Sequence, residues 1–205
     1  MGCDIHLFVE YEREMPVKDS PDNTRQWVSG DYFMQNPYFE VFDDEGQLEH
    51  VPLYRERNYF LFNVLAGVRS HDHSITPISE PKGVPMDSCP YIQKEYESWD
   101  SDGHSHSWLT LGKLIEYQAN NAEIQQAGWL SPKQIEELDK DGITPEYWKL
   151  KSEPGYKAKS WTQKNTVLIP LIELLTKRAK ELITFFDVEN PAHLKTIRIV
   201  FWFDN

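Results

Sequence analysis

The sequence has few cysteines, no long apolar run and no excess of positive charge. Only two of its 205 residues, Cys3 and Cys89, are cysteines, so the chain is not a disulfide-stapled secreted scaffold. The longest strongly apolar stretch, residues 167–175, is too short to cross a bilayer. The first residues contain neither the basic nor the apolar part of a signal peptide. We therefore expect a cytoplasmic protein that has no membrane partner.

The balance of charge limits the classes of partner. Lysine and arginine number 21 against 33 aspartates and glutamates, which gives a net charge of −12. A protein this acidic is not expected to bind a long nucleic acid through its phosphates, although a small phosphorylated ligand can still occupy a local basic pocket. The sequence also lacks the glycine-rich phosphate loops, the Gly-x-Ser-x-Gly motif and the Cys-x-x-Cys motif. The sequence therefore contains no motif that would indicate a kinase, a dinucleotide enzyme, a serine hydrolase or a zinc ribbon.

Hydrophobic periodicity predicts strands at both ends of the chain. Residues 3–12 alternate between apolar and polar side chains, and residues 196–203 form an apolar run of strand length. Helical spacing and capping residues predict helices over 59–68, 91–99, 110–119 and 166–183. We expect an α+β fold with a single mixed or antiparallel sheet and packed helices. The N- and C-terminal strands are expected to lie side by side in the middle of that sheet.

Two further segments complete the expected organisation. The polar residues 13–26 contain two prolines and are expected to form a loop, while residues 38–42 are expected to pair as a hairpin with residues 48–54. Residues 120–160 are polar and interrupted by glycine and proline. We predict a single domain, 1–205, with a polar helical insertion at about 120–160.

Five of the seven histidines fall in three short clusters that each contain an aspartate. Alternate residues of a strand face the same side, so Asp4 and His6 are expected to point together, as are His104 and His106. Carboxylate and imidazole ligands suit a divalent ion such as Zn or Mn. The predicted metal ligands are Asp4, His6, Asp72, His104 and His106, and the predicted catalytic histidines are His6, His71, His73, His104 and His106.

These clusters are compatible with two kinds of phosphoester chemistry. Asp-x-His and Gly-His-x-His are the opening and closing elements of calcineurin-like metallophosphoesterases, and Asp4-Ile5-His6 and Gly103-His104-Ser105-His106 resemble them. The elements of that pattern that lie between them do not fit this sequence. Without a metal, two histidines can act as general base and general acid, as in the 2H phosphoesterases. The competing interpretation is that the histidines and aspartates only satisfy turns and the core of the fold.

A local basic group accompanies the histidines. Arg57 precedes an apolar helix and Arg69 follows it, two residues before His71, so both are candidates to hold phosphate. Trp108, next to the third cluster, is a candidate to stack on a base. The alternatives are that the arginines pair with carboxylates and that the tryptophan belongs to the core.

Four segments of the sequence resemble one family. They are MGCDIHLFVEYE at the start, RNYFLFNVLAGVRS (57–70), DGHSHSWLTLGKL (102–114) and RIVFWFDN (198–205). They are similar to proteins of unassigned function that are encoded by bacteriophages and some bacteria. The resemblance implies a phage or prophage setting, with action in the host cytoplasm, but it brings no reaction and no site residues.

The expected function is a phosphoesterase, a hydrolase acting on a nucleotide or a cyclic nucleotide, as a phosphodiesterase does. By analogy with other phage proteins, it would counteract nucleotide signalling in the host's defence. One alternative is a non-catalytic protein that binds and sequesters a nucleotide. The other is a structural or host-interaction phage protein in which the histidines only support the fold.

Overall fold

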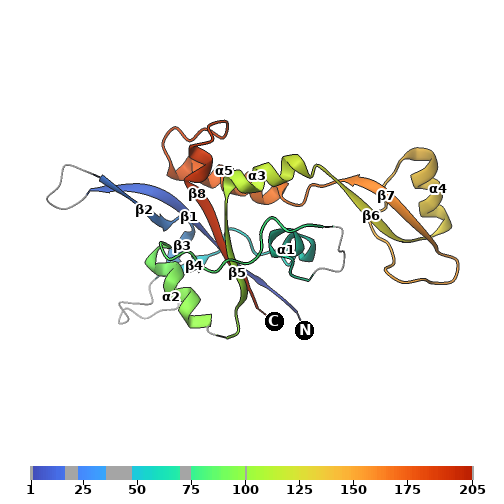
Figure 1. The fold of residues 1–205 in the computed structure, drawn as a ribbon, viewed down its shortest axis with the longest axis horizontal. Helices are drawn as coiled ribbons and strands as arrows, with labels where there is room; N and C mark the ends of the chain where they lie inside the picture. Colours follow the sequence, from blue (N-terminus) through green and yellow to red (C-terminus); the bar gives the residue numbers. More distant parts are fainter. Residues whose placement is uncertain (1, 17–22, 36–47, 70–74, 100, 205) are drawn as a thin grey trace. The chain divides into compact units, whose positions relative to one another are not determined.

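The computed structural model describes residues 2–16, 23–35, 48–69, 75–99 and 101–204 (Figure 1). The chain divides into two compact units. The first comprises Met1–Tyr117 with Val167–Asn205, and the second comprises Gln118–Thr166. Among the helices of the described residues, none has the length and apolar character needed to cross a membrane.

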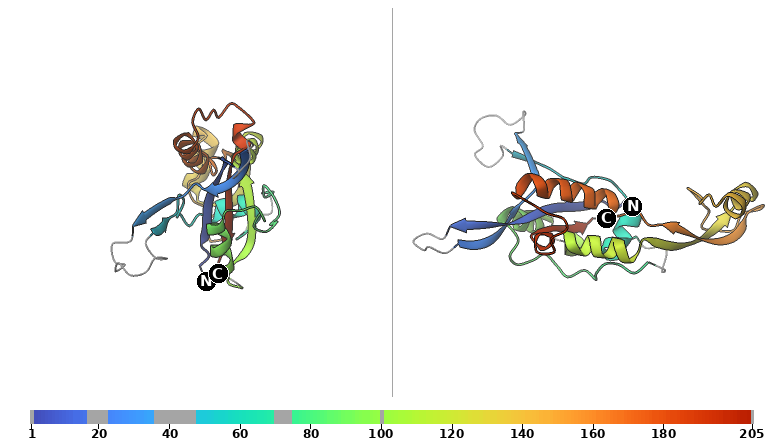
Figure 2. Two further views of the ribbon diagram at one scale, coloured as in Figure 1. Left: turned by 90° about the vertical axis from the view of Figure 1, so that its left-hand side faces the viewer. Right: turned by 90° about the horizontal axis from the view of Figure 1, so that it is seen from above.

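The first unit is built on a four-stranded sheet in the order β2-β1-β8-β5. Its strands are β1 (Ile5–Pro16), β2 (Asn23–Ser29), β5 (His104–Thr110) and β8 (Ile197–Phe203), and every neighbouring pair is antiparallel. The expected α+β fold is confirmed, and so is the central pairing of the first strand with the last. Figures 1 and 2 show β1 and β8 side by side, which places the two ends of the described chain next to each other.

One face of this sheet forms the main hydrophobic core with three helices. The helices are α1 (Tyr59–Ala66), α3 (Leu111–Asn120) and α5 (Ile169–Leu182). Leu7 and Val9 of β1 and Phe201 of β8 are buried in this core. Each such side chain contributes about 1.5–3 kcal/mol to the free energy of unfolding. Asn58 caps α1 as its sequence predicts, because its Oδ1 accepts a hydrogen bond from the N–H of Leu61 at 3.0 Å.

The opposite face of the sheet is covered by α2 (Pro90–Trp99) and is richer in aromatic and polar groups. Phe8, Val200 and Trp202 pack there against Ile92, the one buried residue of the helix. Cys89 lies in the same cluster, and both it and Cys3 are free thiols. Burial raises the pKa of the Cys89 thiol to about 11, so it is protonated at neutral pH.

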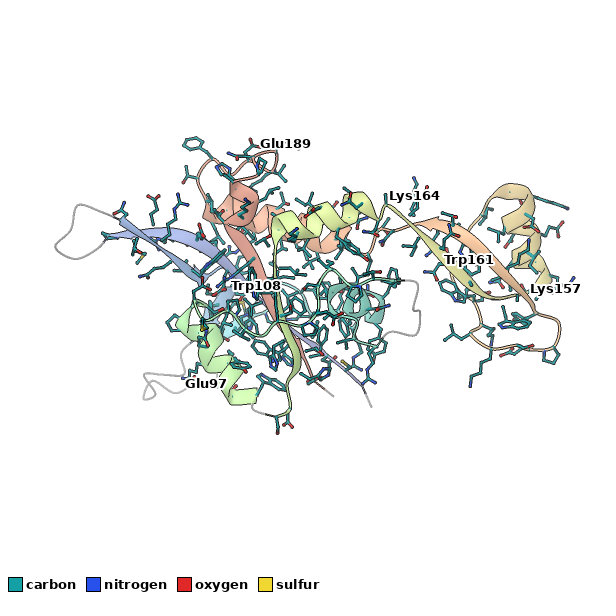
Figure 3. All side chains as sticks on the ribbon, in the orientation of Figure 1. Glu97, Trp108, Lys157, Trp161, Lys164 and Glu189 are labelled. Carbon is teal, nitrogen blue, oxygen red and sulfur yellow. The ribbon has the colours of Figure 1, made fainter. Side chains whose placement is uncertain are left out.

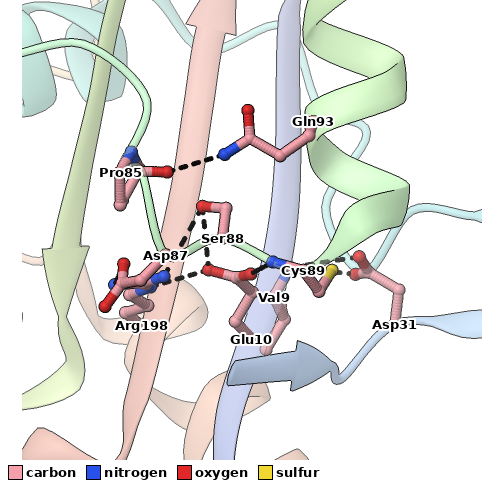
Figure 4. Close-up of polar contacts among 9 residues, drawn as sticks. All are labelled: Val9, Glu10, Asp31, Pro85, Asp87, Ser88, Cys89, Gln93 and Arg198. Atoms are coloured by element: carbon pink, nitrogen blue, oxygen red, sulfur yellow. Dashed lines mark hydrogen bonds and ion pairs between the residues drawn. The ribbon is translucent and has the colours of Figure 1, made fainter. Parts of the chain in front are cut away.

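A buried ion pair crosses the two central strands on the α2 face (Figure 4). Arg198 Nε donates to Glu10 Oε2 at 2.6 Å, and the two side chains are 3 % and 0 % exposed. Glu10 Oε1 also accepts from the N–H of Cys89 at 2.6 Å, which ties the start of α2 to the sheet. Arg198 further pairs with Asp87 at 3.0 Å and stacks on the ring of Trp27 at 3.9 Å. The pair is thus fully surrounded by partners.

The hairpins differ from the sequence prediction. The predicted loop over 13–26 is wrong at both ends, because residues 13–16 belong to β1 and residues 23–26 belong to β2. Pro16 is tolerated because it is the last residue of its strand. A separate two-stranded sheet joins β3 (Tyr32–Gln35) to β4 (Leu48–Val51). The predicted strand over 38–42 lies outside the described residues, so β3 is the partner that the structure gives to β4.

The second unit is a hairpin with one helix rather than a set of helices. Its strands β6 (Glu123–Leu130) and β7 (Lys157–Lys164) pair along their whole length, and α4 (Pro132–Asp141) follows β6. Trp161, labelled in Figure 3, is buried and packs edge-on against Trp148. The prediction of helical segments over 120–160 is wrong for β6 and β7. Both faces of these strands carry polar residues, so the sequence does not show the alternation of apolar and polar residues that indicates a strand.

Replacing Glu10 by glutamine tests the buried ion pair. The Glu10→Gln variant keeps the size of the side chain but removes the buried counter-charge of Arg198 and leaves only the exposed Asp87 carboxylate. We expect a loss of about 3–5 kcal/mol in the free energy of unfolding, measured by urea denaturation. The control is Lys113→Ala, which removes an exposed pair with Glu116 and should cost less than about 1 kcal/mol. Equal losses in both variants would contradict this role for Glu10.

Candidate functional site

The candidate site lies where β1 begins and β8 ends. The register places His6 opposite Trp202, and the backbone N–H of Asp204 donates to the carbonyl of Asp4 at 3.2 Å. Asp204 Oδ1 in turn accepts from the N–H of Asp4 at 2.8 Å. Residues two hundred positions apart in the sequence therefore form one cluster, because the terminal strands are neighbours in the sheet.

His6 and Asp204 form an acid–base pair at this end of the sheet. His6 Nε2 lies 3.1 Å from Asp204 Oδ2, and each side chain is 24 % exposed. The imidazole packs on Trp99 of α2, with ring centroids 4.0 Å apart, and stacks towards Trp202 at 6.1 Å. An aspartate on one ring nitrogen fixes the imidazole's orientation and leaves the other nitrogen for a substrate. The pair is held by packing yet retains contact with solvent.

Asp4 and Arg57 form a second pair beside the first. Arg57 Nε and Nη2 donate to the two oxygens of Asp4 at 2.7 and 2.6 Å, and both side chains are about half exposed. The hydrogen bond from Arg57 lowers the pKa of the Asp4 carboxyl. Arg69 also reaches this segment, since its Nη2 donates to the carbonyl of Gly2 at 3.0 Å. The structure thus brings both predicted phosphate-binding arginines to the chain start that contains Asp4 and His6.

His104 and His106 do not point together, and that prediction is wrong. The register of β5 against β8 shifts between His104 and Ser107, and Ser105 adopts a positive φ of 53°. This bulge inserts an extra residue, which ends the simple alternation of a strand. The His104 ring lies 6.0 Å from Phe203 in the main core, whereas the His106 ring lies 5.7 Å from Trp202 on the α2 face. The two histidines therefore lie on opposite faces of the sheet.

The remaining predicted residues are His71, Asp72, His73 and Trp108. His71, Asp72 and His73 lie outside the described residues. Trp108 is further along β5, where Lys82 Nζ stands 3.6 Å from its ring centroid, so one face of the ring already contacts a cation (Figure 3). Within the described part of the chain, no three His, Cys, Asp or Glu side chains are arranged to hold a metal ion.

The sequence analysis did not identify a second His–Asp pair on the same face of the sheet. His50 Nε2 of β4 lies 3.3 Å from Asp31 Oδ2, and Asp31 is fully buried. Both Asp31 oxygens accept from the N–H of Val9, at 3.2 and 3.1 Å. The His50 ring stacks on Phe8 at 5.0 Å, and Phe8 stacks on Trp202 at 4.8 Å. No spacing signal links His50 to Asp31, because they come from different segments that meet only in the folded chain.

No family model matches this chain, no curated protein matches its sequence, and no solved structure matches its fold. The class that the structure itself defines is an α+β protein with a His–Asp pair at the ends of its terminal strands. The geometry of that pair is the basis for the functional proposal.

The pH dependence of stability tests the burial of Asp31. Burial raises the pKa of this carboxyl, against the opposing effect of His50 and of the Val9 N–H. A group with a raised folded-state pKa stabilises the fold fully only below its unfolded pKa, about 3.9 for aspartate, and this contribution is lost as the pH rises. The unfolding free energy of the wild type minus that of Asp31→Asn should therefore fall as the pH rises above about 4, measured in urea. A difference that rises over this range would contradict the assignment.

Proposed function

We propose that this protein is a phosphoesterase that hydrolyses a linear or cyclic nucleotide, with His6 as its acid–base group. The observation that supports the proposal is the His6–Asp204 pair, partly exposed and adjacent to a half-exposed arginine. Both acid–base chemistry near neutral pH and binding of a phosphate group are available at this one place. Under this proposal the phage setting would make host signalling nucleotides the natural substrates.

The Asp204 contact defines the role of His6. When Nε2–H donates to Asp204, the Nδ1 atom carries the lone pair and can accept a proton. His6 would take a proton from water as the water oxygen bonds to phosphorus. The bond from phosphorus to the leaving oxygen breaks, and the same imidazole returns the proton to that oxygen. Asp204 orients the ring and stabilises its charged form.

Arg57 is the phosphate-binding group of the proposal. Its guanidinium already binds the Asp4 carboxylate through two hydrogen bonds, and this fork geometry matches two phosphate oxygens equally well. An exposed ion pair is weak, so a phosphate can replace or share the contact with Asp4 at low cost. Trp99, packed on His6, offers an aromatic surface next to the phosphate position.

The structure also supports nucleotide binding without hydrolysis as a second candidate. The bulge at Ser105 places His104 and His106 on opposite faces, so the two do not form a joint base and acid. A site with one His–Asp pair, an arginine and tryptophans can enclose a nucleotide and leave it intact. Recovery of the ligand separates the two candidates, because a binding protein returns it unchanged.

A single incubation series tests hydrolysis. Purified protein is mixed with linear and cyclic nucleotides, with Mn or Zn or with EDTA, and products are separated by chromatography before and after heat denaturation. We expect product that His6→Gln reduces by about 10²–10⁴-fold, the usual effect of losing a general base. The matched control is His193→Gln, a histidine near the start of β8 that accepts from the N–H of Asp187, which should keep full activity.

Each other outcome has a distinct meaning. Product in equal amounts from the wild type and from His6→Gln would contradict the role of His6. A nucleotide that leaves the free pool and returns unchanged after heating would favour the binding protein. Loss of product with EDTA would place a divalent ion in the reaction, which is the metal-dependent alternative of the sequence analysis.

A further inference from the structure

Two buried ring nitrogens next to the proposed site have no partner among the described residues. They are Nε1 of Trp202 and Nε2 of His106. The Trp202 side chain is completely buried, although it is the largest side chain in the core of the α2 face. A buried donor without a hydrogen bond is unfavourable, so an unpartnered buried N–H calls for an explanation.

Both rings border the same glycine. A Cβ atom built on Gly103 would lie 3.0 Å from His106 Nε2 and 3.3 Å from Cδ1 of Trp202, the carbon bonded to the unpartnered Nε1. Any larger residue at this position would place its side chain between the two rings. A side chain at position 103 would therefore press against both rings, and glycine avoids this contact.

This place adjoins the proposed catalytic pair. His6 lies opposite Trp202 in the β1–β8 register, and the bulge of β5 places His106 on the other side of Trp202. The order across three strands is therefore His6, Trp202 and His106. Adjacent strands are about 4.8 Å apart, so the backbones at His6 and His106 are separated by roughly 10 Å. A single phosphorylated ligand is long enough to contact both residues.

The last turn of α2 covers this row of rings. Tyr96 lies edge-on against His106 at 4.9 Å and against Trp202 at 6.3 Å, and Trp99 covers His6. Tyr96 is 39 % exposed, and His106 and His6 are partly exposed themselves, so both ends of this row border solvent.

We propose that Trp202 Nε1 and His106 Nε2 form a subsite beside Gly103 that binds a phosphoryl oxygen of the ligand. An indole N–H can only donate, so the group that enters must be an acceptor. Burial lowers the pKa of His106, with a further contribution from His104, so its ring is neutral at neutral pH and binds through a hydrogen bond. The phosphate class of the ligand rests on the proposed function, whereas the need for an acceptor does not.

The indole N–H signal of Trp202 provides a direct test in the full chain. The resonance is assigned by its loss in Trp202→Phe and followed in ¹H–¹⁵N correlation spectra while inorganic phosphate, then adenosine monophosphate, is added. We expect a saturable shift of this resonance. The matched control is the Trp161 indole, which already donates to Gln163 at 3.2 Å in the second unit and should not move. An unmoved Trp202 signal would overturn the proposal and leave a buried water as the partner.

A second variant does not require loss of a core side chain. Gly103→Ala places a methyl group against His106 and Trp202 and should weaken binding of adenosine monophosphate at least tenfold, measured by calorimetry. Trp161→Phe should bind as the wild type does. Unchanged affinity in both Gly103→Ala and Trp202→Phe would refute the subsite.

The nucleotide panel separates this inference from the proposed reaction. A shifted Trp202 signal in a protein that forms no product would support the subsite and contradict the proposal of a hydrolase. Undiminished turnover in Gly103→Ala and Trp202→Phe would support the proposal of a hydrolase and contradict the proposed subsite.

Discussion

The antiparallel pairing of β1 with β8 is the contact on which the rest of the molecule depends. It runs from Ile5 opposite Phe203 to Tyr11 opposite Ile197 and occupies the middle of the sheet. All side chains of β8 are buried, so both faces of this strand must be covered by other elements. The pairing closes a loop of nearly the whole chain, which is entropically costly and must be offset by burial on both faces.

The two faces of the sheet differ in the side chains that they bury. The face under α1, α3 and α5 is apolar and supplies most of the hydrophobic stabilisation. The face under α2 contains the Glu10–Arg198 pair and a continuous series of stacked rings, His50–Phe8–Trp202–His6. Buried polar groups stabilise little by themselves but fix which partners meet. The His6–Asp204 and His50–Asp31 pairs both lie on this second face.

The sequence predicted more of the fold than of the candidate site. Alternation in 3–12, the apolar run in 196–203 and the Asn58 cap are local signals, and each led to the correct element. The joint orientation of His104 and His106 was wrong because a bulge at Ser105 depends on the partner strand rather than on the segment itself. The His50–Asp31 pair had no signal at all, since it joins two segments through a contact with β1.

By itself the sequence determined the fold class, the burial of the first and last strands and the grouping of histidines with aspartates, because periodicity and spacing act over a few residues. Only the tertiary structure decided which groups meet. It brought Asp204 into contact with His6, paired Arg57 with Asp4, and placed the Trp202 ring between those of His6 and His106. These contacts join residues that are far apart in the sequence, and the strand register that helps to set them is fixed by packing across the whole sheet.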